Sequence, residues 1–237
     1  MIRRPPRSTQ SRSSAASDVY KRQPKVGGRF SQRKRYTLIV GDDISRHTWV
    51  CFTLHKSDAT VKSLTDTRTD GVPSKVVIGQ SDGGGEFRGG KFGDLCRSRS
   101  IIKQEFTTVD SPQFNGVAER ALSLIETAAM AGRIQASELF TGTQLPATAW
   151  LWAEAFHWAC GSLNSKANTA NPESKSPYEM WHGRPPLVVV LPFLKPGCCK
   201  VKRENKSRAK AQECFYLGPA RTTPETLHEC RLHTALC

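Results

Sequence analysis

Short apolar runs and turn residues alternate through the first half of the chain. Tyr36–Val40 and Thr48–Leu54 are rich in β-branched and aromatic residues, and the polar residues 42–46 stand between them. This pattern predicts two strands joined by a turn. The runs 75–80 and 101–108 have the same character and predict two further strands.

Apolar residues recur with helical spacing in the second half of the chain. The segments 111–135 and 147–164 each carry one apolar stripe, which predicts two amphipathic helices. In the first of them the stripe consists of Ala118, Leu122, Ile125 and Ala129. The segments 57–71 and 89–100 predict shorter helices between the strands. Strands that alternate with helices after an initial hairpin indicate an α/β domain with a mixed sheet.

The stripe of 147–164 is rich in tryptophan and allows two interpretations. Its members are Trp152, Ala155, Phe156, Ala159, Cys160 and Leu163. An aromatic face can stack on nucleic-acid bases. A helix face with this periodicity more often packs on a core, and we expect that here.

Residues 1–23 differ in composition from the rest of the chain. They are rich in Arg and Ser and hold few residues that could be buried, so we expect them to be disordered. The stretch SRSSAASDVYKRQ resembles translated adapter sequence. We therefore interpret 1–23 as a non-native segment, and a targeting peptide is the alternative.

The net charge of +14 is concentrated near the two ends of the chain. Residues 1–35 hold eleven Lys or Arg and one Asp, residues 195–210 hold seven and one Glu, and residues 36–194 are nearly neutral. Basic segments on either side of a neutral body suggest a polyanionic partner. The longest apolar run, 187–194, is too short to cross a bilayer, so we expect no membrane partner.

Candidate chemistry begins at the end of the strand predicted for 75–80. In KVVIGQSDGGGEF, Asp82 follows that strand and precedes three glycines. The strand end holds the carboxylate rigidly, and glycines let an anionic substrate approach the backbone closely. Such an acid suits a hard divalent cation that bridges carboxylates and phosphate oxygens.

A second acid is needed, because one carboxylate cannot hold a catalytic metal. Glu119 lies in the first turns of the helix predicted in 111–135, with 36 residues between it and Asp82. A lone glutamate on a helix surface is usually a solvated charge. The strand and short helix between the two acids would let them converge, and we predict that they share a cation.

The motifs SDGGGEF and SPQFNGVAER together resemble the integrase catalytic core of retroviruses and LTR retrotransposons, the Copia-like Pol polyproteins in particular. The likeness extends to YTLIVGDDISRHTWVCFTLHK, ATAWLWAEAFHWACGSLNS, SPYEMWHGRPP and AKAQECFYLGPA. It implies an α/β fold of the ribonuclease-H-like type. That fold is a mixed five-stranded sheet flanked by helices, here with a C-terminal helical and irregular extension.

The resemblance also implies a function in DNA integration. The activity would be metal-dependent polynucleotidyl transfer, comprising 3′-end processing and strand transfer, on double-stranded DNA of the element ends and the target. Asp82 and Glu119 would be catalytic and would hold two Mg²⁺ (or Mn²⁺) ions. The residues expected to contact DNA are Gln113, Asn115, Arg120, Lys202 and Arg203. Members of this family work as multimers, so we expect a homo-oligomer located in the nucleus, with a cytoplasmic particle stage.

The chain departs from the family pattern at the first strand. The first catalytic Asp of the family would fall near residues 24–28, where the sequence is PKVGG. Asp18 stands upstream, in the segment interpreted as non-native. Asp42 and Asp43 fall in a turn, where capping is their expected role. We therefore predict an incomplete acidic triad and no catalysis by this chain.

We expect four regions along the chain. They are the disordered segment 1–23, an N-terminally truncated integrase core in 24–140, a helical extension in 141–186 and a basic C-terminal region in 187–237. The main alternative is a non-catalytic, nucleic-acid-binding remnant of a mobile element. A purely structural α/β interaction domain is another, and GGGEF is superficially similar to the hairpin motif of cyclic-dinucleotide synthases.

Overall fold

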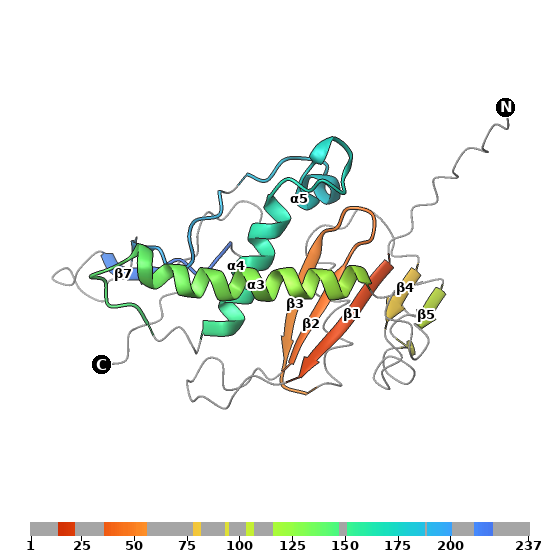
Figure 1. Cartoon of the computed structure of the whole chain (residues 1–237), viewed down its shortest axis with the longest axis horizontal. Coiled ribbons are helices and arrows are strands. Elements are labelled where there is room, and N and C mark those ends of the chain that lie inside the picture. The colour runs from red at the N-terminus through yellow and green to blue at the C-terminus, as the bar shows by residue number, and fades with distance from the viewer. Residues whose placement is uncertain are drawn as a thin grey trace.

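A mixed sheet forms the centre of the molecule (Figure 1). The computed structural model describes residues 14–21, 36–55, 78–81, 93–94, 103–106, 116–146, 151–187, 189–200 and 211–219. The strand order of the sheet is β3-β2-β1-β4-β5. The pairs β1–β2 and β2–β3 are antiparallel, whereas β1–β4 and β4–β5 are parallel. The bounds are β1 Ser14–Lys21, β2 Tyr36–Gly41, β3 Thr48–Thr53, β4 Ile78–Ser81 and β5 Lys103–Phe106.

The β2–β3 hairpin matches the predicted strand pair and buries both of its faces. Ile39 of β2 pairs with Val50 of β3, and both belong to the main core cluster. Leu38 pairs with Cys51 on the opposite face, where they join a second, smaller cluster. Near-continuous apolar runs are typical of strands that are covered on both sides.

Two helices cover the Ile39 face of the sheet. They are α3 (Gly116–Leu139) and α4 (Trp152–Ser165), which pack against each other, α3 against β1 and β2 and α4 against β3. In Figure 1, α3 crosses the sheet and extends beyond it toward β7. The predicted stripe of α3 is buried as expected, so the helical periodicity is confirmed.

The tryptophan-rich stripe of α4 lies in the core. Trp152 and Phe156 are buried, and the Trp152 ring meets Phe52 of β3 edge-on at a centroid distance of 5.3 Å. Leu163 is partly buried against the same cluster. The expectation that this face packs on a core is confirmed, and its rings are not available to stack on bases.

The C-terminal part contains short elements that the sequence pattern did not predict. They are the 3₁₀ turn η3 (Pro172–Ser174), α5 (Pro177–His182), β6 (Pro196–Lys200) and β7 (Ala211–Phe215), with β6 and β7 paired antiparallel. Ser176 caps α5 through its side chain and Gly183 ends it at φ 68°, and both are ordinary helix boundaries that a six-residue helix makes easy to miss.

Strand β1 corrects one expectation about the N-terminal segment. Residues 14–21 lie between β2 and β4 in the sheet, so the prediction that all of 1–23 is disordered is wrong for these residues. The physical reason is that a strand is held by main-chain hydrogen bonds, which need no apolar sequence when both neighbours are present. Composition alone therefore missed the strand.

Other predicted elements are confirmed only in part. β4 is described from Ile78 and α3 from Gly116, and residues 75–77 and 111–115 of the predicted elements lie outside the described residues. The helix predicted for 57–71 lies outside the described residues, as does most of that predicted for 89–100.

Candidate nucleic-acid and metal site

The candidate site lies where β1 and β4 run side by side. In this parallel pair, Ser14 is opposite Ile78 and Ser17 is opposite Ser81. Ser81 is the last residue of β4, and Asp82 follows it directly in the sequence. The acid that the sequence predicts as a metal ligand therefore follows a strand that is central in the sheet, and its own position lies outside the described residues.

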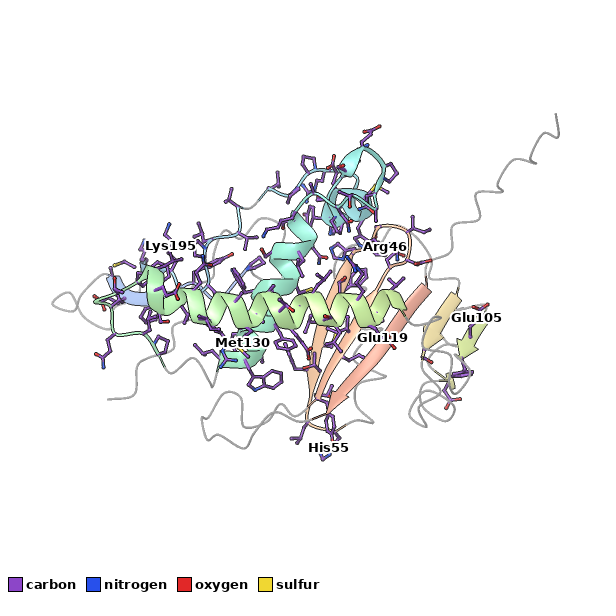
Figure 2. The ribbon with its side chains drawn as sticks, in the orientation of Figure 1. Arg46, His55, Glu105, Glu119, Met130 and Lys195 are labelled. Atoms are coloured by element: carbon purple, nitrogen blue, oxygen red, sulfur yellow. The ribbon has the colours of Figure 1, made fainter. Side chains whose placement is uncertain are left out.

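Glu119 lies at the start of α3, on the side of the molecule where β1 and β4 meet. It occupies the first turn of the helix and is exposed, as is its neighbour Arg120. Figure 2 shows Glu119 at the end of α3 that is nearer to β1 and β4, and α3 packs against β1. The helix thus offers an accessible carboxylate above the sheet, as predicted.

Asp18 is a residue of this region that the sequence analysis set aside. In β1 it follows Ser17, the partner of Ser81, and it is in register with Ile39 of β2. The side chain of Ile39 belongs to the core cluster beneath α3 and α4. Residues opposite each other in a pair of strands share a face, so the register position of Asp18 is on the α3 side of the sheet. The only sequence feature that could have indicated strand β1 is the segment Asp18-Val19-Tyr20, because valine and tyrosine favour strands.

The remaining predicted DNA contacts divide by location. Arg120 is exposed beside Glu119 on α3. Gln113 and Asn115 precede α3, and Lys202 and Arg203 fall between β6 and β7; all four lie outside the described residues.

Asp42 and Asp43 perform the structural role that the sequence predicted. Asp42 is buried, and its Oδ2 accepts hydrogen bonds from the backbone N–H and the hydroxyl of Ser45, both at 2.7 Å. Asp43 forms an ion pair with Arg46 at 2.9 Å. Both carboxylates stabilise the β2–β3 turn, which explains their presence without a catalytic role.

Glu119 of α3 is an exposed carboxylate, which is the type of ligand that a hard divalent cation prefers. Asp18 lies in β1, the strand beside β4. Among the described residues, no three His, Cys, Asp or Glu side chains form a ready cluster. A site in this chain would therefore need Asp82 as well.

Solved structures of other proteins share the fold of this chain. One of them is the integrase catalytic core domain of HTLV-2, in complex with magnesium and described in a trimeric form. The alignment covers 74% of this chain and 100% of the HTLV-2 chain, with a TM-score of 0.51 and 18% sequence identity. Another is a simian T-cell lymphotropic virus intasome in complex with the PP2A regulatory subunit B56 gamma. The alignment covers 88% of this chain and 70% of the matched chain, with a TM-score of 0.53 and 15% sequence identity. The chain has the fold of integrase catalytic cores.

The chain is also similar in sequence to a curated Pol polyprotein of a transposon. The Retrovirus-related Pol polyprotein from transposon TNT 1-94 of Nicotiana tabacum is 26% identical over 196 residues, which is 78% of this chain and 13% of that protein. The chain thus spans about an eighth of the relative's length. No family model matches the sequence. The predicted resemblance to the integrase core of a Copia-type Pol polyprotein is confirmed.

Within the part of the chain that the structure covers, no helix has the length and apolar character that a bilayer crossing requires.

Proposed function

We propose that this chain is the catalytic core of an integrase that transfers polynucleotide ends into DNA. The likeness in sequence to a transposon Pol polyprotein and in fold to integrase cores carries this proposal. The arrangement of β1, β4 and α3 supports it, because two parallel strands and a helix start bring acid-bearing segments to one side of the sheet.

The acids of the proposed site are Asp18, Asp82 and Glu119. The sequence predicts an incomplete triad, and β1 offers Asp18 for the missing position, since Ser17 pairs with Ser81 next to Asp82. Bound Mg²⁺ or Mn²⁺ would make a coordinated water more acidic and stabilise charge on phosphate oxygens. The protein's part is to hold these carboxylates on strands and a helix, and Arg120 beside Glu119 is suited to a DNA phosphate.

Strand transfer on a short DNA duplex that carries the element end tests this function. With Mn²⁺ or Mg²⁺ we expect product from the full chain, and a loss of at least about 100-fold in each of Asp18→Asn, Asp82→Asn and Glu119→Gln, because each removes a metal ligand. Glu138→Gln is the matched control, since Glu138 is an exposed glutamate at the other end of α3.

The possible outcomes separate the proposals. Product that depends on Asp82 and Glu119 but not on Asp18 would support the function and refute the role of Asp18. No product, together with retained DNA binding, would favour the non-catalytic remnant that the sequence left open. Neither product nor DNA binding would contradict both.

DNA binding by the basic tail gives an independent test. If Lys202 and Arg203 each neutralise one phosphate, the double alanine variant reduces the slope of log affinity against log salt by about 2, at roughly 0.9 per contact. Lys166→Ala and Lys175→Ala together form a control of equal charge outside the tail. An unchanged slope in the Lys202/Arg203 variant would exclude the tail as a DNA contact.

A further inference from the structure

Helix α5 is attached to the β2–β3 hairpin by a cluster of aromatic rings and histidines. We define this cluster as His47 and Trp49 of the hairpin with Tyr178, Trp181 and His182 of α5. The His47 ring stacks on Trp181 at a centroid distance of 5.8 Å and an interplanar angle of 29°. Trp181 also meets Trp49 edge-on at 4.8 Å, and the centroids of the His47 and Trp49 rings lie 4.5 Å apart, so Trp181 packs against both hairpin side chains.

His47 is the buried centre of this cluster. Only 5% of its surface is exposed, and its Nδ1 has no hydrogen-bond partner. Its backbone is fixed by the turn, because its N–H donates to the Ser45 hydroxyl and its carbonyl accepts from the Asp42 N–H. Trp181 contributes a second buried polar atom without a partner, the indole Nε1. Among the described residues, the side chains in ring contact with His47 are Trp49, Tyr178, Trp181 and His182, none of which could stabilise a charged imidazolium as a carboxylate would.

The described acids of the hairpin turn near His47 already bind other residues, and the neighbouring His182 would carry the same positive charge as a protonated His47. On the hairpin, Asp42 binds Ser45, and Asp43 pairs with Arg46. From α5, the His182 ring is edge-on to His47 at 5.6 Å, so protonation of both would bring two positive charges together. Tyr178 of α5 also lies near the His47 ring, at a centroid distance of 6.4 Å. The other described titratable groups of α5 and η3 are Glu179, in the first turn of α5, and Glu173, which pairs with Lys175. From α4 comes Asn164, which is uncharged and binds Thr48.

We propose that this cluster is a pH-sensitive latch, in which protonation of His47 releases α5 from the β2–β3 hairpin while the rest of the core stays folded. The core stays folded because α3 and α4 cover the opposite face of the sheet, and the main cluster includes neither His47 nor Trp181. The latch goes beyond the proposed DNA chemistry and does not depend on it.

The direction of the pH effect follows from burial. Burial, and secondly His182, lower the pKa of His47 from 6.5 to about 3. The released imidazole has its ordinary pKa, so it takes up a proton at a pH where the docked one does not. The free energy that holds α5 on the β2–β3 hairpin is therefore largest above about pH 6.5. It decreases as the pH falls, and it does not change further below about pH 3. Within that window each pH unit multiplies the opening equilibrium by up to about 10.

The test is ¹⁹F NMR of the full chain labelled with 5-fluorotryptophan, titrated from pH 7.5 to 4.5. Substitution of single tryptophans by Phe assigns the signals. We expect the signals of Trp49 and Trp181 to move toward released values as the pH falls, and those of Trp152 and Trp158 in α4 to stay. His47→Phe keeps the ring stack and is expected to abolish the shift of Trp181, and His47→Gln is a second non-titrating variant in case the first fails to fold.

His55→Gln is the matched control, because His55 is exposed and lies at the opposite end of the hairpin from Arg46 in Figure 2. It is expected to titrate like the unchanged chain. The latch is overturned if Trp181 does not respond above pH 4.5, or if the two His47 variants respond as the unchanged chain does. It is also overturned if the signals of Trp49, Trp181, Trp152 and Trp158 all move together, since that would be global unfolding.

Discussion

At the scale of single residues, Asp42 shows how a carboxylate that looks catalytic can be structural. Its Oδ2 satisfies two donors of Ser45 inside the buried turn. The sequence was sufficient for this assignment, because paired acids in a turn between two strands are ordinary capping residues.

Replacing Asp42 by Ala is expected to destabilise the protein by about 1–3 kcal/mol, since the buried Ser45 N–H and hydroxyl lose their acceptor. Asp43→Ala is the control, because its ion pair with Arg46 is partly exposed and such pairs contribute roughly 0–1 kcal/mol. Urea unfolding followed by circular dichroism measures both. Equal losses in the two variants would show that the turn does not depend on the buried carboxylate.

Gly132 of α3 is a second residue whose identity matters, because there is no room for a side chain at this position. A Cβ at this position would lie 2.5 Å from Cζ3 of Trp158. The Trp158 ring cannot easily move away, because its Nε1 donates to the Leu191 carbonyl at 2.8 Å and the ring packs on Phe193. The glycine therefore allows α3 and α4 to approach closely.

Gly132→Ala is expected to lower stability by about 1–3 kcal/mol through overpacking, although alanine favours a helix by roughly 1 kcal/mol. Gly116→Ala, in the same helix, has no atom within 4 Å of the added Cβ and is expected to be neutral or stabilising. Thermal unfolding distinguishes the two. A stabilised Gly132→Ala would mean that the Trp158 ring is free to shift.

At the scale of elements, helix periodicity and β-rich runs were enough to predict β2, β3, α3 and α4. Each of these buries an apolar stripe or a continuous apolar run, and burial is the property that periodicity records. β1 and α5 were not predictable in this way. β1 is held by main-chain pairing on two sides, and α5 is a six-residue helix attached through a few aromatic side chains.

The sequence predicted the position of one acid of the candidate site but not that of another. Glu119 lies in the first turn of α3 as predicted. Asp18 could not be assigned, because its place beside β4 depends on a strand pairing that no local pattern reveals. Long-range register is information that a single sequence carries weakly.

Asn164 joins α4 to β3 and gives a prediction about how these elements are held together. Its Oδ1 accepts from the Thr48 N–H at 3.0 Å, and its Nδ2 donates to the Thr48 carbonyl at 2.7 Å. Asn164→Ala is expected to cost about 1–3 kcal/mol, because the Thr48 N–H loses its acceptor and the Thr48 carbonyl keeps only the weaker donor Cys160 Sγ at 3.0 Å. Asn168→Ala is the control, since Asn168 accepts only a local, exposed bond from Ala170. Equal unfolding midpoints in urea would contradict the prediction.

At the scale of the whole molecule, the sheet depends on β1. This strand separates the β2–β3 hairpin from the parallel pair β4–β5, and both sides of the sheet pair with it. The interpretation of residues 1–23 as a disordered, non-native segment implies that their removal leaves the fold unchanged, whereas the pairing of β1 implies that it destabilises the sheet.

Deletion of residues 1–23 is expected to lower the melting temperature by several degrees and to broaden the transition, since about 1–2 kcal/mol already shifts the melting temperature of such a chain by several degrees. Deletion of residues 1–13 keeps β1 and serves as the control. Scanning calorimetry compares the two truncated chains with the full one. If both deletions leave melting unchanged, β1 contributes nothing to the stability of the sheet.

The position of β1 also suggests that this strand can be supplied as a separate peptide. A strand that pairs with a neighbour on each side through main-chain hydrogen bonds does not have to be part of the same polypeptide, because an extended peptide can add to a sheet in the same way. A synthetic octapeptide with this sequence, added to the chain that lacks residues 1–23, should insert between the two halves of the sheet and restore the melting transition. Peptides with other residues in place of Asp18 would then allow the chemistry of that position to be varied without changing the rest of the protein.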